Sequence, residues 1–407
     1  MEKTPLNRRD RRGAGVVVAL LLALVMTACG AGEADEPAKG SEPSVSGSSV
    51  PSGSSSSSSA GVEAAAALVE KYSAPITDFP DVGPVDGAAD LAGKSVWYVP
   101  IGMGPPAFQV YADSLTEALS ALDIDVHVCD GKFVPTAITA CLEQAGSSGA
   151  DAVVTGYVAY VLVSQAVDEL VKKGVKVMIG GDEAPEGVSN TDMLAFRGTL
   201  DSQLLQQELT ASTMIADSGG TANVLYIANS EIPSLQLSAD HAVDFIGKNC
   251  PACKVTRIEY TTTGLDKLPS AVSAALIKEP HTDYIFAELD TAVPAAIAGA
   301  RSAGFEDKVK IGGVGGDLAV LQGIDGDGPV LATTGSLLSF ASWLFADDVV
   351  RMLAGQVPAD EGLTVPSRLF TKANVSDLSL TPEGYASMEW YGSDAYKDKF
   401  LAAWGAE

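Results

Sequence analysis

The 407-residue sequence is poor in histidine and in basic residues, and it lacks two motifs that many enzymes carry. Its three histidines, His127, His241 and His281, are far apart; a G-x-x-x-x-G-K-[ST] phosphate loop is absent, and the folded part has no G-x-S-x-G elbow. Lys and Arg number 26 against 52 Asp and Glu, for a net charge of −26. Nucleic acid and anionic lipid are bound by clustered basic residues, which this chain does not offer. We therefore expect a binding protein without catalytic activity, cofactor, metal or nucleic-acid partner.

A hydrophobic run long enough to cross a membrane is also missing from the N-terminus. Four arginines within residues 8–12 precede an apolar run over 14–26, about 13 residues against the roughly 20 that a transmembrane helix needs. Basic, apolar and small residues in this order are typical of an export signal. The sequence Met-Thr-Ala-Cys at 26–29 resembles a bacterial lipobox, although Leu is usual where Met26 stands. We predict that residues 1–28 are a lipoprotein signal peptide and that Cys29 is the lipidated N-terminus.

The segment after Cys29 contains almost no large apolar side chains. Residues 29–60 are mostly Ser, Gly, Pro, Glu and Ala, which cannot bury enough surface to offset the entropy of ordering the chain. We predict a disordered tether, with a reach on the order of 30 Å. Removal of the signal takes away five basic and two acidic residues, so the net charge changes from −26 to −29. The protein is expected at the extracytoplasmic face of the cell membrane, held by its lipid.

Cysteine is scarce as well, and the four that remain after Cys29 suit an exported protein, in which disulfides persist. Four cysteines allow three pairings, and we predict the local one, Cys129 with Cys141 and Cys250 with Cys253. The alternative for Cys-Pro-Ala-Cys at 250–253 is a thioredoxin-like redox centre, which needs a strand before it and a helix after it. The predicted order here is the reverse. A zinc site is less well supported, because no second Cys or His pair stands at ligand spacing nearby.

From residue 94 the chain alternates short β-rich runs with segments of helical period. In the first half, apolar strands are predicted at 95–101, 125–128, 152–155, 175–179 and 194–197, with helices between the first four. In the second half, strands are predicted at 223–228, 255–260, 284–287 and 309–311, again with helices between them. Strands that are apolar throughout indicate parallel sheets covered on both faces. The fold class is therefore α/β, with two doubly wound lobes. After residue 331 we expect a helix, an extended run at 367–371 and a terminal helix.

These segments, in this order and spacing, resemble the substrate-binding lipoproteins of bacterial ABC importers, specifically the type I periplasmic-binding-protein group of ribose- and other sugar-binding proteins. The resemblance covers about residues 92–375. It is carried by strands with their exit turns at 96–108, 149–154, 174–182, 286–290 and 311–317. Bacterial repressors share this two-lobe body but begin with a DNA-binding helix pair, where this chain has an export signal.

The resemblance implies a domain layout and a function. The chain should cross between lobes three times, near Gly198, Ser336 and Pro366. The predicted layout, after the signal and tether, is a helix and lead-in at 61–91, lobe 1 at 92–198 with 337–366, and lobe 2 at 199–336 with 367–407. The implied protein is a monomer that captures a small solute, a sugar or a sugar-like compound, and delivers it to an ABC permease. A ligand sensor that feeds a membrane kinase would use the same body.

The ligand site is expected where the carboxyl ends of the strands face each other across an interlobe cleft. An aromatic ring there can stack on a sugar while carboxylates accept from hydroxyls. Phe108 and Tyr157 could instead belong to the lobe core, and Asp182 or Asp290 could cap a helix. The predicted ligand-binding residues follow the strands: Met103, Phe108, Tyr157, Asp182, Glu183, Ser230, Glu231, Thr263, Glu288, Asp290, Gly315, Asp317 and Ser336.

The chain departs from the sugar-binding relatives at three of these positions. Those relatives usually have Asp-Arg, Asn-Asp and a later Asp where this chain has Asp182-Glu183, Leu289-Asp290 and Gly315. The missing arginine removes a rigid fork of hydrogen-bond donors. A less polar or a cationic solute is therefore an alternative to a typical pentose or hexose.

Overall fold

A computed structural model of the protein describes residues 54–358 and 363–406. The predicted signal peptide at 1–28, the lipidation at Cys29 and most of the predicted tether lie outside the described residues. Among the residues that are described, no helix is both long and apolar enough to cross a membrane.

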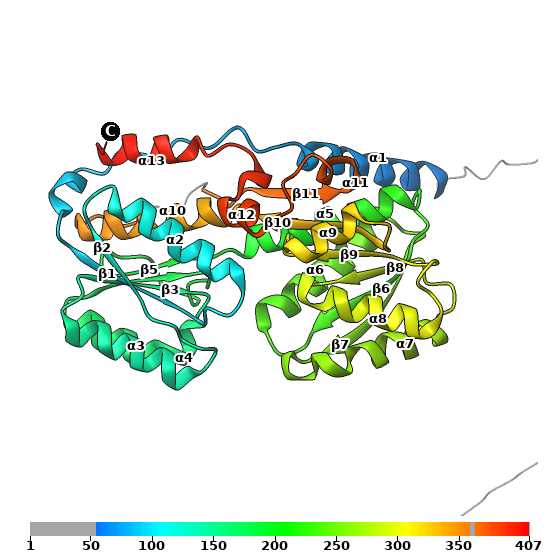
Figure 1. The fold of residues 1–407 in the computed structure, drawn as a ribbon, viewed down its shortest axis with the longest axis horizontal. Helices are drawn as coiled ribbons and strands as arrows, with labels where there is room; N and C mark the ends of the chain where they lie inside the picture. Colours follow the sequence, from blue (N-terminus) through cyan, green and yellow to red (C-terminus); the bar gives the residue numbers. More distant parts are fainter. Residues whose placement is uncertain (1–53, 359–362, 407) are drawn as a thin grey trace, which may run out of the picture. The chain divides into compact units, whose positions relative to one another are not determined.

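The first lobe contains a five-stranded parallel sheet in the order β2-β1-β3-β4-β5. Helices α2 and α10 cover one face of this sheet, and α3 and α4 cover the other (Figure 1). The strands are β1 (Ser95–Pro100), β2 (Asp125–Val128), β3 (Ala152–Gly156), β4 (Lys176–Gly180) and β5 (Leu194–Arg197). The helices of this lobe are η1 (Ala88–Leu91), α2 (Pro106–Ser120), α3 (Pro135–Ser148), α4 (Tyr160–Lys172) and α10 (Leu338–Leu353).

The second lobe contains a six-stranded sheet in the order β11-β10-β9-β8-β6-β7, in which only the β10–β11 pair is antiparallel. Its strands are β6 (Asn223–Asn229), β7 (Lys254–Tyr260), β8 (Tyr284–Ala287), β9 (Lys310–Val314), β10 (Val330–Ser336) and β11 (Ser367–Thr371). Its helices are α1 (Ser54–Ser73), α5 (Leu200–Asp217), α6 (Pro233–Asn249), η2 (Thr262–Lys267), α7 (Leu268–Lys278), η3 (Asp290–Ala292), α8 (Val293–Ala303), α9 (Leu318–Asp325) and α11 (Lys372–Val375).

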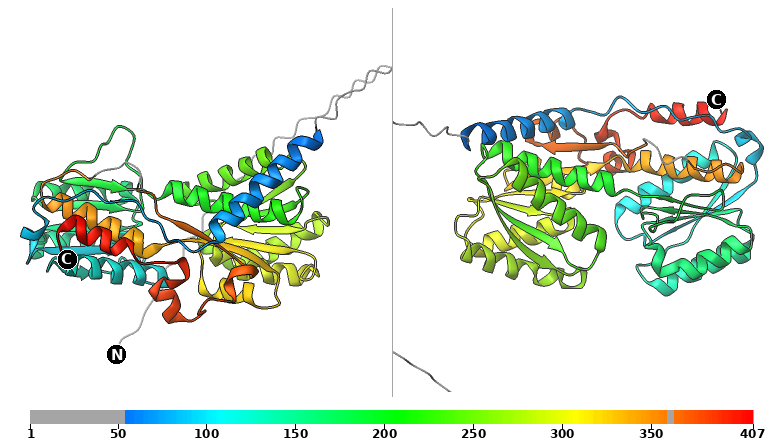
Figure 2. Two further views of the ribbon diagram at one scale, coloured as in Figure 1. Left: turned by 90° about the horizontal axis from the view of Figure 1, so that it is seen from above. Right: turned by 180° about the vertical axis from the view of Figure 1, so that it is seen from behind.

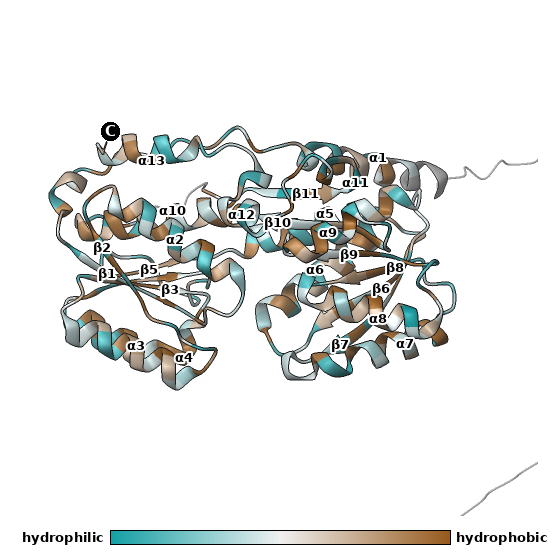
Figure 3. Ribbon diagram, viewed as in Figure 1, coloured by the Kyte–Doolittle hydropathy of each residue, from teal (hydrophilic) through white to brown (hydrophobic). Residues whose placement is uncertain are grey.

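The inner strands of both sheets are buried on their two faces, as their apolar sequences predicted. Every residue of β3 and β8 is buried, and these inner strands are strongly hydrophobic (Figure 3), whereas the edge strands β2 and β7 are mostly exposed or half-buried. Parallel strands need helical connections that cover both faces of the sheet, which explains why their sequences are apolar without alternation. The predicted two-lobe α/β fold is confirmed.

The chain passes between the lobes at the three predicted places. Strand β5 ends at Arg197 in the first sheet and α5 begins in lobe 2; β10 ends at Ser336 and α10 begins in lobe 1; β11 returns the chain to lobe 2 at Ser367. Two further segments also connect the lobes. Residues 74–87 run from α1 to η1. Residues 388–395, which include the short helix η4 (Glu389–Tyr391), run from α12 (Pro382–Ser387) to α13 (Tyr396–Trp404). We call these two segments the strap.

The two segments of the strap are hydrogen-bonded to each other. The Ile76 amide donates to the Tyr391 carbonyl at 2.8 Å, and the Ser393 amide donates to the Ile76 carbonyl at 2.8 Å. Figure 2 shows the segment that follows α1 (blue) running beside the C-terminal segment (red) toward α13. At the lobe 2 end, the buried Arg368 of β11 donates to the carbonyls of Ser73 and Trp390. The strap therefore adds two connections to the three-crossing hinge.

Two predicted boundaries need correction. Helix α1 begins at Ser54, inside the segment 29–60 that was predicted to be disordered. Helix α1 packs on α5, and extending a docked helix by a residue costs less than nucleating one. The assignment of all of 367–407 to lobe 2 is wrong for α13, which packs on α10 in lobe 1. Trp404 stacks on Trp343 at 5.6 Å, and the Tyr396 hydroxyl bonds that of Ser339 at 2.8 Å.

The predicted disulfide pairing is confirmed. Cys129 is bonded to Cys141 and Cys250 to Cys253, with Cα atoms 5.8 and 5.3 Å apart. The first bond links the end of β2 to α3. The second lies between α6 and β7, the order that disfavours a redox centre, and Cys250 packs with Ala65 of α1 and Ile215 of α5. The second disulfide thus belongs to the surface on which α1 docks.

Candidate functional site

The strand ends of lobe 1 gather an aromatic cluster. Phe108 lies in the first turn of α2. The centre of its ring is 6.0 Å from that of Tyr157 and 6.2 Å from that of Phe133, and both pairs of rings meet edge to face. Tyr157 follows β3 and shares a 2.6 Å hydroxyl–hydroxyl hydrogen bond with Tyr111. Burial raises the pKa of Tyr157 above its ordinary value, so the phenol stays neutral. The structure therefore brings two of the predicted residues, Phe108 and Tyr157, into contact.

Tyr157 is held by an unusual backbone conformation. Its φ is +58°, in the left-handed region that residues other than glycine rarely adopt. Gly181 lies beneath the ring, where an added Cβ would come within 2.7 Å of it. The turn after β4 therefore needs glycine because the Tyr157 ring occupies the space.

Asp182 and Glu183, which follow β4, accept hydrogen bonds from helix N-termini. Asp182 Oδ2 accepts from the Tyr160 amide at 2.7 Å, at the start of α4. Glu183 Oε1 accepts from the Leu200 amide at 3.1 Å, at the start of α5. A carboxylate is favourable at both places, because the free amides and the helix dipole present partial positive charge. Since α5 belongs to lobe 2, Glu183 also joins the first interlobe crossing to lobe 1.

The strand ends of β6 and β7 carry three predicted residues that form a local turn. The Glu231 carboxylate accepts from the Thr262 amide at 2.6 Å, and the Ser230 hydroxyl bonds the Tyr260 carbonyl at 3.2 Å. Thr263 is exposed in η2 beside them. Asn229, which was not predicted, binds the Glu231 and Ile232 amides through Oδ1. These bonds connect the two strand ends to each other.

Glu288, at the end of β8, is a fully buried carboxyl group. Its Oε2 accepts from the Asn229 amide at 2.6 Å, while Oε1 has no hydrogen-bond partner. Burial raises the pKa of Glu288 from 4.5 to about 8, against the opposing charge of Arg257. The group is therefore largely protonated near neutral pH, and because Oε2 accepts from the Asn229 amide, the proton lies on Oε1, which can still donate a hydrogen bond.

This burial predicts a pH dependence of stability that Glu288→Gln should remove. Between pH 4.5 and 8 the unfolded chain has lost the Glu288 proton while the folded protein keeps it, so the free energy of unfolding falls as pH rises. Glu288→Gln should be more stable than the wild type at pH 8, by roughly 2–4 kcal/mol, and equal to it near pH 4.5. Urea unfolding across this range measures the effect. Asp168→Asn, at an exposed position of α4, is the charge-matched control; identical profiles for Glu288→Gln and wild type would contradict the assignment.

Asp290 and Asp317 lie together at the exits of β8 and β9. Both Asp290 oxygens are 2.8 Å from the Thr333 hydroxyl, and Oδ2 accepts from the Asp317 amide at 2.9 Å. Burial, followed by the charge of Asp317, raises the pKa of Asp290 to about 7. Gly315 has φ +153°, and its Cβ position lies 3.0 Å from Asp290. The Asp290 side chain occupies the space that a side chain at position 315 would need, which favours glycine in this turn.

The C-terminal segment approaches this acidic pair. The Tyr391 hydroxyl would lie 2.5 Å from a Cβ on Gly316 and 2.1 Å from one on Gly335. Burial raises the pKa of Tyr385 above its ordinary value, and the charges of Asp317 and Asp290 add to the effect. Ser336, at the end of β10, accepts from Gln206 at 2.7 Å. Sequence reasoning missed Tyr385 and Tyr391, because nothing in the sequence indicated that the tail returns to the strand ends.

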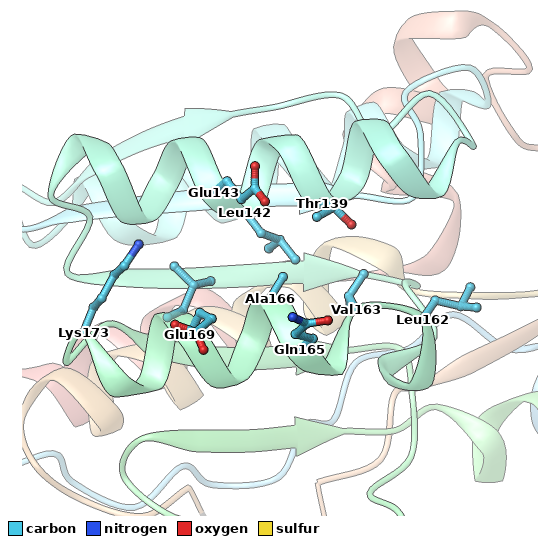
Figure 4. A pocket seen from close by; sticks show the side chains of 10 residues that line it. Thr139, Leu142, Glu143, Leu162, Val163, Gln165, Ala166, Glu169 and Lys173 are labelled. Atoms are coloured by element: carbon cyan, nitrogen blue, oxygen red, sulfur yellow. The ribbon is translucent and has the colours of Figure 1, made fainter.

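Two cavities add to this description. A groove of about 260 Å³ lies between α3 and α4, with Leu142, Leu162 and Ala166 on its walls (Figure 4). None of the predicted ligand residues lines it. A second cavity of about 340 Å³ lies at the hinge and is lined by the first crossing, residues 197–202, together with Glu183 and residues 363–365. Within residues 54–358 and 363–406, His, Cys, Asp and Glu side chains form no group of three or more that could hold a metal ion.

The comparisons with known proteins agree on the fold. No protein-family model matches the chain, and no curated protein matches it. The solute-binding protein of a 5-methylthioribose transporter from Thermotoga lettingae, solved with 5-methylthioribose, superposes with a TM-score of 0.62 at 16% identity, covering 80% of this chain and 100% of that chain. A periplasmic ribose ABC transporter protein from Conexibacter woesei gives 0.60 at 15% identity, covering 70% of this chain and 94% of that one.

A third solved structure, an ABC transporter solute-binding protein from Mycobacterium smegmatis with bound glycerol, gives a TM-score of 0.60 at 15% identity, over 70% of this chain and 96% of that one. At these identities the likeness concerns the fold. The architecture of this chain is that of the type I periplasmic binding proteins, as the sequence patterns indicated.

Proposed function

We propose that this protein is the extracytoplasmic solute-binding lipoprotein of an ABC importer. It captures a small polyhydroxylated solute between the strand ends of its two lobes and delivers it to a membrane permease, while Cys29 carries the lipid anchor. The observation that carries the proposal is that each of the two lobes has side chains suited to binding at its strand ends. Lobe 1 offers the Phe108–Tyr157 aromatic cluster, and lobe 2 offers Glu288, whose Oε1 has no partner.

Several predicted carboxylates contribute to this site indirectly. The carboxylates of Asp182, Glu183 and Glu231 each accept a hydrogen bond from a backbone amide. The Asp290 carboxylate accepts from the Thr333 hydroxyl and the Asp317 amide. Their role is to fix the turns that present the neighbouring groups. Glu288 is the acidic residue to which we assign direct contact with the solute, because a solute hydroxyl can bond to its free oxygen.

A cationic solute is the second candidate, and Glu288 is the observation that favours it. A bound ammonium group would stabilise the carboxylate form, so that binding releases the proton that the empty protein holds at pH 7. A neutral sugar or polyol would leave Glu288 protonated. Calorimetric titration in buffers of different ionisation enthalpy separates the two classes, because only proton release makes the observed enthalpy depend on the buffer.

The proposal is tested by thermal shift and calorimetry with a panel of sugars, polyols, nucleosides and polyamines. At least one solute should raise the melting temperature of the wild-type protein, because a ligand that binds only the folded state stabilises it. Glu288→Ala should weaken the binding of that solute by about tenfold or more, because it removes the buried group that hydrogen-bonds to the solute. Asp168→Ala, at an exposed position of α4, is the matched control. If no member of the panel binds, or if binding is unaffected by Glu288→Ala, the assigned function or site is wrong.

A further inference from the structure

The loop between β2 and α3 holds an aromatic ring that the strand-end pattern did not identify. Phe133 is 51% exposed, yet its ring contacts the Phe108 ring edge to face at 6.2 Å. Phe133 stands five residues beyond the end of β2, a strand exit from which no ligand-binding residue was predicted. It extends the lobe 1 aromatic cluster outward.

The backbone that carries this ring is strained. Lys132 and Phe133 are consecutive non-glycine residues with positive φ, +53° and +56°. Such residues are uncommon and cost stability, and they persist only where the surrounding structure imposes them. Of the non-glycine residues with positive φ in the described chain, Tyr157 is another, so two rings of the cluster are held this way.

Several contacts impose the conformation. The Phe133 amide donates to the Ile101 carbonyl at 2.7 Å. Asp130 Oδ1 accepts from the Lys132 amide at 2.8 Å and from the Met103 amide at 3.0 Å. The Cys129–Cys141 disulfide joins the start of the loop to α3. The loop is thus attached along its length to the exit of β1 and to α3.

The Phe133 ring also packs closely over the backbone of Gly102. A Cβ on Gly102 would clash with the Phe133 ring, so a larger residue there would displace the ring from its present position. The same arrangement recurs at Gly181 beneath Tyr157, 2.7 Å from the ring. At two strand exits of lobe 1, therefore, a glycine makes room for an aromatic ring that is carried on left-handed backbone.

We propose that Phe133, together with Phe108, forms an apolar subsite that receives an alkyl, alkylthio or aryl substituent of the bound solute. This inference rests on the proposed function and names the substrate class for that site. A half-exposed ring on a strained backbone is not explained by the stability of the loop, since asparagine or glycine would fit the left-handed conformation better. Strained backbone is often found where a side chain must be positioned for a ligand, and a solute substituent that covers the ring would account for it here.

The subsite is continuous with the rest of the candidate site. Phe108 touches both Phe133 and Tyr157, so the three rings form one surface from the β3 exit to the β2–α3 loop. A sugar-like body against Tyr157 would place a substituent on the Phe133 side. Apolar side chains bind such groups with substantial discrimination, about tenfold or more for each added methylene-sized group.

The test uses matched pairs of solutes that differ only in the substituent. The mature protein is titrated calorimetrically with ribose and 5-methylthioribose, and with methyl and phenyl β-glucoside. In each pair that binds, the member with the larger apolar group should bind about tenfold tighter or more. Phe133→Asn suits the left-handed backbone and removes the ring, and it should abolish this preference. Phe133→Tyr keeps the ring and should retain it. Ile277→Asn, at a 67% exposed position of α7 in lobe 2, is the matched control and should behave as wild type.

Each outcome decides between the claims. A preference that Phe133→Asn removes and Phe133→Tyr retains supports the subsite. If the parent sugar binds equally well, or if Phe133→Asn weakens both members alike, the subsite is refuted while the proposed function stands. If both pairs fail to bind, the subsite is refuted, and the proposed function fails with it only when the whole solute panel fails too. A Phe133→Asn protein that binds every solute normally but no longer supports uptake in cells refutes the subsite in favour of a protein-docking role for the ring.

Discussion

Arg368→Ala should lower the free energy of unfolding by about 1–3 kcal/mol, because it leaves the buried Trp390 carbonyl without its donor and leaves the Ser73 carbonyl with Asn374 alone. The Arg368 side chain is buried in β11, and its guanidinium donates to the Ser73 carbonyl through Nε and Nη2, both at 3.2 Å, and to the Trp390 carbonyl. Ser73 is the last residue of α1, where a cation also interacts favourably with the helix dipole. One side chain therefore fixes the lobe 2 ends of both segments of the strap.

Urea unfolding of Arg368→Ala against wild type measures this effect, with Arg301→Ala as the control. Arg301 forms an ion pair with Glu306 at 3.2 Å, but its side chain is 73% exposed, and exposed pairs contribute at most about 1 kcal/mol. Equal losses in the two variants would show that Arg368 does not anchor the strap.

Trp404→Ala should have an effect of similar or larger size at the other end of the strap. Trp404 is 2% exposed, stacks on Trp343 at 5.6 Å, and donates from Nε1 to Asp347 at 2.9 Å. Truncating a buried tryptophan costs about 3–5 kcal/mol, since apolar contacts are lost and a cavity remains. Because α13 is terminal, we expect much of this loss to appear as undocking of α13 from α10.

Hydrogen exchange tests whether the undocking spreads into the strap. The Val85 amide donates to the Ala403 carbonyl at 2.8 Å, and Phe79 packs against Tyr396 at 5.1 Å. Trp404→Ala should therefore speed exchange in residues 76–85 as well as in α13. Leu401→Ala, a partly buried position on the same helix, is the control and should change exchange much less. Faster exchange confined to α13 would mean that the two segments of the strap are not coupled.

The sequence predicted short β-rich runs between helical segments, and strands β2, β5 and β8 have the predicted bounds. Only β8 of these three is apolar throughout; β2 is Asp-Val-His-Val, and β5 ends in Arg197. Strand β10 was not predicted, although it lies inside the second sheet, between β11 and β9. Its middle, Thr333 and Thr334, is buried through hydrogen bonds to Asp290, Gln206 and Thr210. These partners are distant in sequence, so no local pattern could reveal the burial.

The strap could not be predicted from local sequence patterns, because its contacts also join residues that are distant in the chain. Its connections depend on Arg368 meeting Ser73 across almost 300 positions of the chain and on Trp404 meeting Trp343. The strand ends on which the candidate site is proposed were predictable, because the strands can be read from the sequence. Which carboxylates are already occupied was not predictable, since backbone amides such as those of Tyr160 and Leu200 are the partners. Phe133 escaped attention because its importance comes from a positive φ and from Gly102.

The central claim is that a solute bound between the lobes draws them together, and an interlobe distance tests it most directly. Leu162, 61% exposed at the start of α4, and Leu237, 56% exposed at the start of α6, lie on helices that follow strand exits in the two lobes. Spin labels on Leu162→Cys/Leu237→Cys report their separation by pulsed electron paramagnetic resonance. Saturation with a solute that raises the melting temperature should shorten and narrow the distance distribution, because closure lets both lobes contact the ligand. A distribution unchanged at saturation would contradict the account.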